Sequence, residues 1–312
     1  MTTNEERREA AKRKLEERLE REQQERRRRR IIIASVSTVL VVAVAATVTA
    51  IVVKKIHDDR EAARWTSCEY QNQADRLKML PTDPPAGVPA AQRDEYRKYA
   101  AAMNKDIAAG IPKKRTAPKP GNRQLKDGKV HVVFDTSQGV IPATLDRTGA
   151  ACNTGAVLSL IKDKFYDQTP CHRMTTTKGL KVLQCGDPTG TGASGPGWSS
   201  PDEPPLNIDM GDGNNQAMTQ SITYRRGTIA IANSNQAGQS SNTGSSQFFL
   251  VIQDSELPAE YSVVGKVDDA GLKVLDKIYA GGVAPGPMGQ SGDGKPKLPV
   301  SITSATIQGN DS

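Results

Sequence analysis

The sequence predicts a β-rich domain, an antiparallel barrel whose ends are covered by helices, carried behind a long N-terminal segment. Three observations support this prediction. Short runs of alternating apolar and polar residues recur from Val130 onward, and turn residues separate them. An early stretch of this region has apolar residues on one helical face, and a second helix is expected late in it. An uninterrupted apolar run, Ile31–Val53, lies far upstream of the domain.

The first strands of the domain are the clearest. Val130, Val132 and Phe134 alternate with other residues, and alternation resumes at Ile141 after a short turn, which predicts a hairpin over 130–145. The other expected elements, in chain order, are a helix over 153–164, a hairpin over 171–186, a loop over 186–218, strands near 228–233, 247–252 and 262–267, a helix over 269–278 and a strand over 300–307. Many short strands with one early and one late helix favour a barrel capped by helices.

The N-terminal segment has two parts of opposite character. Residues 1–30 are polar, with glutamates four residues before arginines, a spacing typical of a solvated helix. The run 31–53 carries no charge and matches the ~20 residues of a transmembrane helix, and it is too long for the apolar region of a signal peptide. We therefore expect a single-pass protein of the cell membrane, its N-terminus cytoplasmic and its domain extracytoplasmic.

Between the apolar run and the domain we expect a partly helical stalk. Prolines interrupt it after residue 80, good helix formers occupy 91–109, and a basic, proline-punctuated linker follows at 113–122. The expected division is a basic cytoplasmic segment at 1–30, a transmembrane helix at 31–53, a stalk at 54–127 and the folded domain at 128–309.

Composition and motifs argue against several functions. The chain has a net charge of +7, but much of it lies in the first thirty residues, and only 4% of residues are aromatic, so we expect no nucleic-acid partner. Gly190–Gly195 fits a dinucleotide-binding pattern, but the proline-rich run after it prevents the required helix. The three histidines lack metal-ligand spacing. We expect no cofactor and no metal.

The stretch from Cys171 to Gly186 holds the strongest candidate site. It reads as two apolar runs around a polar turn, with Arg173 on the way in and Gln184 on the way out, on the same face. Some sixty residues later, Phe248 and Phe249 provide two of the four phenylalanines of the chain. Because the two alternate, Phe248 should be core. A guanidinium, an amide and an aromatic wall suit a site that binds an apolar group and directs a donor at it.

These segments resemble the cyclophilin family of peptidyl-prolyl isomerases. The likeness is carried, in order, by His172-Arg173, Val182-Leu183-Gln184, Ile231-Ala232-Asn233, Ser246–Phe249 and Val263–Val267, and it covers roughly 128–309. It implies a closed eight-stranded antiparallel barrel capped by two helices. It also implies that Arg173 and Gln184 are catalytic. The implied substrate-binding residues are His172, Val182, Ala232, Asn233, Gln247, Phe249, Leu257 and Tyr261.

The chemistry of the reaction suits these residues. Rotation about an X-Pro bond crosses about 18–20 kcal/mol, because amide resonance is lost in the twisted state. The proline nitrogen then becomes a hydrogen-bond acceptor, and Arg173 would donate to it. Phe249, Leu257 and Val182 would hold the ring, Gln184 would orient Arg173, and the backbone of Asn233 would hold the neighbouring residue.

The sequence departs from the family in several places. Between Arg173 and Gln184 there are about three more residues than usual, and Lys181 stands where an aromatic is common. Tyr261 replaces a common histidine. Glu256 aligns with a tryptophan associated with cyclosporin binding, so we expect weak binding of that drug.

The four cysteines, Cys68, Cys152, Cys171 and Cys185, allow three pairings or reduced thiols. Alternation in a regular hairpin disfavours a bridge between Cys171 and Cys185, because it places them on opposite faces.

The leading hypothesis is an isomerase that accelerates the folding of exported proteins at the outer face of the membrane. A second is a non-catalytic module of the same fold that binds proline-containing segments of an envelope partner. A third is a structural anchor that acts through its arginine-rich tail.

Overall fold

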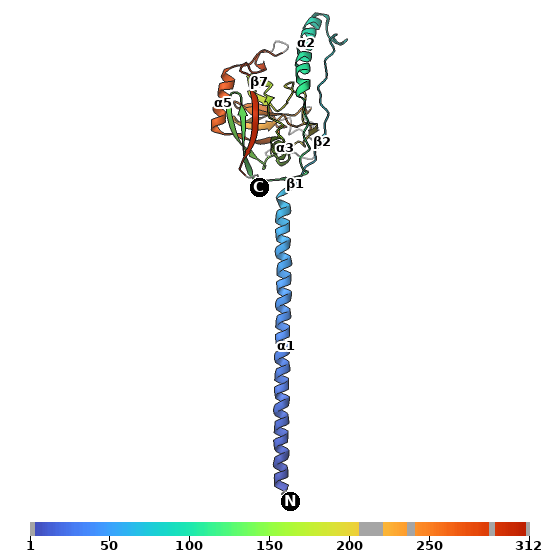
Figure 1. Ribbon diagram of the computed structural model, residues 1–312, viewed down its shortest axis with the longest axis vertical. Coiled ribbons are helices and arrows are strands. Elements are labelled where there is room, and N and C mark those ends of the chain that lie inside the picture. The colour runs from blue at the N-terminus through green and yellow to red at the C-terminus, as the bar shows by residue number, and fades with distance from the viewer. Residues whose placement is uncertain (1–3, 206–220, 236–240, 287–290, 310–312) are drawn as a thin grey trace. The chain divides into compact units, whose positions relative to one another are not determined.

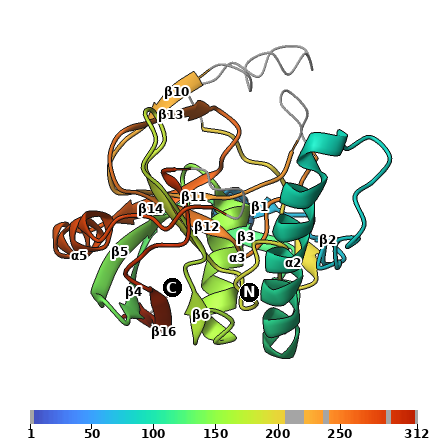
Figure 2. The same cartoon turned by 90° about the horizontal axis from the view of Figure 1, so that it is seen from above.

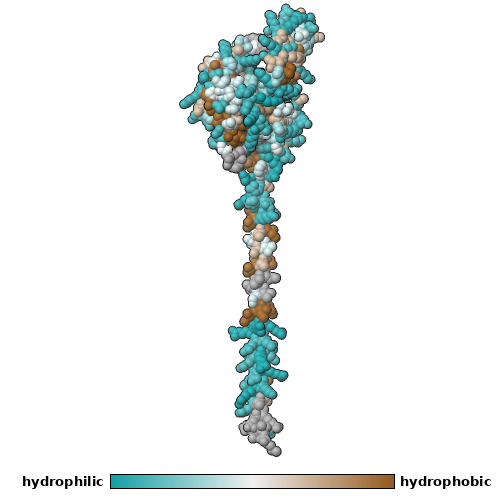
Figure 3. Space-filling model, viewed as in Figure 1, coloured by the Kyte–Doolittle hydropathy of each residue, from teal (hydrophilic) through white to brown (hydrophobic). Residues whose placement is uncertain are grey.

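The computed structural model describes residues 4–205, 221–235, 241–286 and 291–309. The chain divides into two compact units, Met1–Ala63 and Arg64–Ser312. The first unit is one helix, α1 (Asn4–Ala63). Its i,i+4 ion pairs include Glu9–Arg13 at 3.8 Å and Glu22–Arg26 at 3.9 Å. Figure 3 shows that hydrophilic residues give way to hydrophobic ones along this helix.

The prediction of a transmembrane helix is not supported. Among the residues that the structure describes, no helix is long and apolar enough to cross a membrane. The helix α1 continues without a break through residues 30 and 53 (Figure 1). No proline or glycine occurs between Asn4 and Ala63, so nothing in the local sequence interrupts the backbone hydrogen bonds of the helix.

The second unit is built on one antiparallel sheet. Within the described residues ten strands pair in the order β15-β7-β8-β12-β11-β14-β5-β4-β16-β6. In chain order they are β4 (Lys129–Thr136), β5 (Gly139–Asp146), β6 (Thr169–Pro170), β7 (Arg173–Thr175), β8 (Val182–Cys185), β11 (Thr228–Ile231), β12 (Phe248–Val251), β14 (Val263–Val267), β15 (Asp293–Gly294) and β16 (Ser301–Gln308). The predicted first hairpin is confirmed, since β4 and β5 pair from Lys129–Asp146 to Thr136–Gly139.

The predicted closed barrel of eight strands is wrong. In the described part of the chain the sheet is open, with β15 and β6 as its two edges. The reason lies at β7, which pairs with β8 on one side and with the short strand β15 on the other. Closure would require the edge strands β15 and β6 to pair with each other, and no such pairing occurs among the described residues. Sequence patterning missed β15 because two residues cannot display alternation.

Two helices accompany the sheet, as the sequence predicted. They are α3 (Ala151–Lys162) and α5 (Asp269–Ala280). The core includes Phe134, Tyr166 and Phe248, whose rings meet at centroid distances of 5.4–6.4 Å. Phe248 is thus a core residue. A smaller pair of strands, β10 (Ser221–Tyr224) and β13 (Ser255–Pro258), lies outside the main sheet and was not anticipated.

The segment from Arg64 to Asp127, expected to be a stalk, belongs to the second compact unit. It contains α2 (Arg93–Gly110), which lies on the opposite side of this unit from α5 (Figures 1 and 2). Turns of 3-10 helix, η1 (Ala90–Gln92) and η2 (Ile111–Lys113), flank α2. The segment also contains β1 (Trp65–Ser67), β2 (Gln71–Asn72) and β3 (Arg123–Leu125). β1 pairs with β3, and β2 pairs with β9 (Trp198–Ser199).

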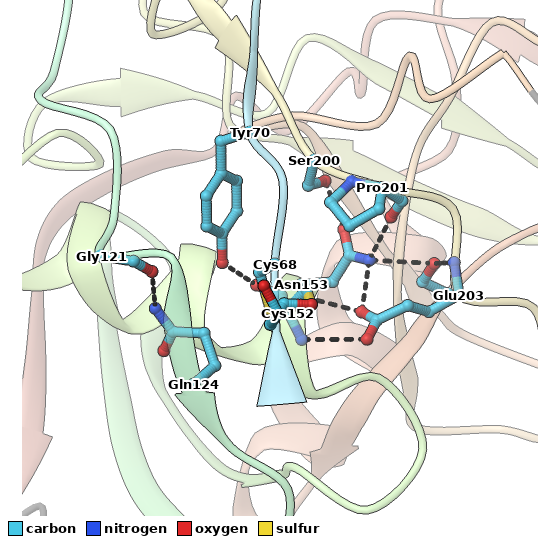
Figure 4. Close-up of a disulfide and its surroundings, with 11 residues drawn as sticks. Cys68, Tyr70, Gly121, Gln124, Cys152, Asn153, Ser200, Pro201 and Glu203 are labelled. Carbon is cyan, nitrogen blue, oxygen red and sulfur yellow. Dashed lines mark hydrogen bonds between the residues drawn. A yellow bond between two sulfur atoms is a disulfide. The ribbon is translucent and has the colours of Figure 1, made fainter. Parts of the chain in front are cut away.

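A disulfide between Cys68 and Cys152 fastens this segment to α3 (Figure 4). Beside it the Tyr70 hydroxyl donates to the carbonyl of Cys152 at 2.7 Å. The Glu203 carboxylate accepts from the backbone N–H groups of Cys152 and Asn153 at 3.0 and 2.8 Å, which satisfies free donors at the start of α3. The segment is therefore attached by covalent and polar contacts rather than extended into solvent.

The second disulfide joins Cys171 and Cys185, so the prediction that disfavoured this bridge is wrong. Alternation holds within β7 and β8, where Arg173 pairs with Gln184. Cys171 lies before β7, and its N–H donates to the carbonyl of Val300 at 2.9 Å. Because the chain changes pairing partner at this corner, the alternation along β7 does not predict the face of the sheet on which Cys171 lies.

Candidate active site

The main site residues lie in one row across the sheet. Arg173 on β7 pairs with Gln184 on β8, which pairs with Phe249 on β12, which pairs with Ala230 on β11. Residues opposite one another on neighbouring strands point to the same face. The register therefore brings the predicted guanidinium, amide and aromatic ring onto one face, although 76 positions separate the numbers 173 and 249.

The guanidinium of Arg173 is held from two directions. Its Nε and Nη2 donate to the two carboxylate oxygens of Asp293, at 2.8 and 2.7 Å. Its Nη1 donates to the Oε1 of Gln184 at 3.3 Å. The hydrogen bonds to Asp293 raise the pKa of Arg173 further above its ordinary value, although burial opposes the shift. The side chain is 41% exposed, so it remains accessible to a bound molecule.

Gln184 connects the arginine to the next part of the site. Its Nε2 donates to Oε1 of Gln247 at 2.9 Å, and Nε2 of Gln247 donates to the carbonyls of Gly192 and Ser194 at 2.9 and 3.1 Å. These bonds fix both amides, because each side chain uses its oxygen and its nitrogen. A polar cavity of ≈ 190 Å³ lies here. Its lining includes Gln184, Gln247, Ala232, Asn233 and, from the segment before the domain, Gln73–Arg76.

An aromatic wall stands beside the row. The rings of Phe249, Tyr261 and Tyr224 contact one another edge to face, with centroids 5.3–6.3 Å apart. The Tyr224 hydroxyl donates to the carbonyl of Pro258 at 3.1 Å. Burial raises the pKa of Tyr261 to about 12, with a contribution from Glu260, so this phenol is neutral at pH 7. The apolar cluster around these rings includes Val182, Ala230 and Val251 as buried members and Leu257 as a partly buried one.

The predicted contact between the backbone of Asn233 and a bound peptide is compatible with the structure. The side chain of Asn233 is engaged, since its Nδ2 donates to the carbonyl of Glu260 at 3.0 Å. The N–H of Ala232 donates to the carbonyl of Gln247 at 2.9 Å, which fixes the backbone just before Asn233. Asn233 lines the same cavity as Gln247, so its backbone can face a bound peptide.

His172 is arranged differently from the other predicted site residues. Both of its ring nitrogens are shielded from solvent and lack a hydrogen-bond partner among the described residues. The pKa of His172 is lowered to about 4, mainly by burial; Asp187 opposes the shift, and Arg173 and Lys295 add to it. The imidazole is therefore neutral at pH 7. It lines a second cavity, which Arg173 and Asp293 also line, rather than the one that is lined by Gln184 and Gln247.

Two residues of the site escaped sequence reasoning. Asp293 lies 120 positions after Arg173, in a stretch of glycines and polar residues without periodicity. Tyr224 lies just beyond residues 206–220, which are outside the described part of the chain. The only available signal for Tyr224 was the alternation of Ile222 and Tyr224. No local signal could have connected Asp293 to Arg173.

A guanidinium held beside an aromatic wall and an apolar cluster on an antiparallel sheet is the arrangement expected of a cyclophilin-type domain. The comparison with protein families agrees: residues 131–307 match the family described as "Cyclophilin type peptidyl-prolyl cis-trans isomerase/CLD". The chain belongs to this family.

The chain is similar to known isomerases over part of its length. The "Probable peptidyl-prolyl cis-trans isomerase B" of Mycobacterium tuberculosis (strain CDC 1551 / Oshkosh) is 41% identical over 190 residues, which cover 61% of this chain and 58% of that protein. The "Peptidyl-prolyl cis-trans isomerase" of Helicobacter pylori (strain ATCC 700392 / 26695) is 33% identical over 155 residues, or 49% of this chain and 82% of that protein. The likeness thus spans little more than half of the mycobacterial relative.

A solved structure, the cyclophilin type peptidyl-prolyl cis-trans isomerase cgd2_1660 of Cryptosporidium parvum, is 26% identical to this chain with a TM-score of 0.44. The match covers 59% of this chain and 99% of that one.

Proposed function

We propose that this protein is a peptidyl-prolyl cis-trans isomerase that acts on proline-containing segments of other polypeptides. The observation that carries the proposal is the row formed by Arg173, Gln184 and Phe249 beside the aromatic wall. Membership of the cyclophilin family supports it.

The geometry supplies what the rotation of a prolyl bond requires. The apolar cluster around Phe249 can hold the proline ring. Arg173 can donate a hydrogen bond to the proline nitrogen, which accepts one only when the amide is twisted out of its plane. An interaction made only in the twisted state lowers the barrier rather than merely tightening substrate binding.

We further propose that the substrates are proteins that fold outside the cytoplasm. All four cysteines of the chain are joined in two disulfides. Disulfides persist in oxidising compartments and are rare in the cytosol. This feature supports a role in the folding of exported proteins.

A protease-coupled assay with an X-Pro peptide tests the activity. The full chain with its disulfides intact should accelerate the cis-to-trans step well above the uncatalysed rate. Arg173→Ala should reduce kcat/KM about 10²-fold, as removal of one transition-state donor does in other enzymes. A wild-type chain that binds the peptide without acceleration would instead identify a non-catalytic module that binds proline-containing segments. An Arg173→Ala variant as active as the wild type would contradict the mechanism.

The compartment is tested separately. A fusion of the full chain to a reporter that folds only outside the cytoplasm should be active in the native host. A reporter active only in its cytoplasmic version would contradict the proposed location.

A further inference from the structure

Asp293 and Gln184 approach Arg173 from the two strands that flank β7, Gln184 from β8 and Asp293 from β15. Asp293 lies on the short edge strand β15, where it pairs with Thr175 of β7. Its carboxylate accepts two hydrogen bonds from the guanidinium, one from Nε and one from Nη2, at 2.8 and 2.7 Å. A carboxylate bound in this parallel manner fixes the plane of the guanidinium as well as its position.

The N–H donors of Arg173 that these contacts leave unused therefore have a fixed direction. An arginine side chain has five N–H donors. Two are engaged with Asp293 and one with Gln184, so two have no partner among the described residues, one on Nη1 and one on Nη2. Because the plane is fixed from both edges, these two N–H bonds have a defined direction before substrate arrives. A donor that is oriented in advance loses little freedom when the twisted amide forms.

β15 is in turn held by a helix outside the residues that match the family. Nζ of Lys295, two positions after Asp293, pairs with Oδ2 of Asp106 on α2 at 2.8 Å. A cavity of ≈ 680 Å³ separates α2 from the back of the site, lined by Tyr99 and Met103 on one side and by Arg173 and Asp293 on the other. The Asp106–Lys295 pair therefore links α2, across this cavity, to the residue that follows β15.

We propose that Asp293 is a positioning residue for Arg173, and that α2 keeps Asp293 in place through the Asp106–Lys295 ion pair. This inference rests on the proposed isomerase function, and it makes the segment before the family domain a working part of the site. Asp293 acts through Arg173 and does not contact the substrate.

The central test is a double-mutant cycle in the full-length chain with its disulfides intact. Asp293→Ala should lower kcat for an X-Pro peptide about tenfold and leave KM within about twofold, since a misplaced donor weakens mainly the twisted state. In the Arg173→Ala background the same substitution should change kcat less than about twofold, because the group it positions is absent. Equal losses in both backgrounds would overturn the proposal.

Two further variants separate positioning from folding. Asp293→Asn retains the shape and one acceptor, so its kcat should fall between those of the wild type and Asp293→Ala. Asp276→Ala is the matched control: Asp276 on α5 also accepts from two guanidinium nitrogens, those of Arg226, at 2.7 and 2.9 Å. It should leave kcat unchanged. If it lowers kcat as much as Asp293→Ala does, the effect is general destabilisation and the proposal fails.

The contribution of α2 is tested on the same helix. Asp106→Ala should reduce kcat about two- to threefold, the scale of an exposed ion pair. Asp94→Ala removes a pair with Arg97 at 2.8 Å that lies within α2 itself, and it should have no effect. Equal activities of the two variants would overturn the role of α2. A wild-type chain without any acceleration would instead refute the proposed function, so the two failures are distinguishable.

Discussion

The ring of Phe249 contacts the ring of Tyr261 edge to face, with centroids 5.3 Å apart and planes at 86°. Phe249 is 5% exposed, whereas Tyr261 is only partly buried. Phe249 therefore lies inside the apolar cluster, and Tyr261 lies at its partly exposed edge.

The contact between Phe249 and Tyr261 should affect activity through the ring of Tyr261 and not through its hydroxyl. Edge-to-face pairs contribute about 0.5–1.5 kcal/mol, so Tyr261→Ala should lower kcat/KM about tenfold when its apolar contact with the proline ring is also lost. Tyr261→Phe keeps the ring and should retain at least half of the activity. The measurement is kcat/KM for one X-Pro peptide. A Phe variant as impaired as the Ala variant would show that the hydroxyl is needed.

The two disulfides should contribute unequally to stability. Cys68 and Cys152 are 84 positions apart, whereas Cys171 and Cys185 are 14 apart. In the chain-entropy description, the longer loop stabilises by about 4–5 kcal/mol and the shorter by about 3 kcal/mol. Replacing each pair by serines and measuring denaturant unfolding checks the order. A smaller loss for the Cys68–Cys152 pair would show that the N-terminal segment is already restrained in the unfolded chain.

His172 should make the fold sensitive to mild acid. Its pKa is about 4 in the folded chain and 6.5 as a free side chain, so the unfolded state binds a proton first. Its contribution to stability is therefore complete above pH 6.5 and is lost as the pH falls from 6.5 towards 4. The loss amounts to about 3 kcal/mol at pH 4.

His172→Gln removes this titration. Between pH 7 and pH 4 the free energy of unfolding of the wild type should fall by about 3 kcal/mol more than that of the variant. His131→Gln is the control, because His131 is exposed on β4. The prediction is wrong if His172→Gln and the wild type lose stability in parallel.

Cyclosporin should bind weakly. Glu256 on β13 is exposed, and its carboxylate accepts from the hydroxyl of Thr223, so it offers the drug a charge in place of an indole. Glu256→Trp should strengthen inhibition about tenfold, a gain of about 1.4 kcal/mol, by adding apolar contact area. The measurement is the drug concentration that halves isomerase activity. Strong inhibition of the wild type would contradict the prediction.

Sequence patterns predicted individual elements well where many neighbouring residues contribute. The hairpin β4–β5 and the helix α3 were expected from their periods, and α2 from a run of good helix formers; a helix near α5 was expected as well. The alternation of Phe248 and Phe249 also separated a core ring from a site ring. Short elements such as β15, with two residues, carry no period and were missed.

The sequence by itself determined the longer strands and helices, and it indicated that Arg173 and Gln184 share a face. Only the tertiary structure decided that Asp293 holds Arg173, that Cys171 joins Cys185, that the sheet is open, and that the segment before the domain packs against it. The physical reason is range: periodicity records how a residue relates to its neighbours along the chain. The partners of Arg173 and Cys171 are set by strand register and by the corner between β6 and β7, which depend on the packing of distant segments.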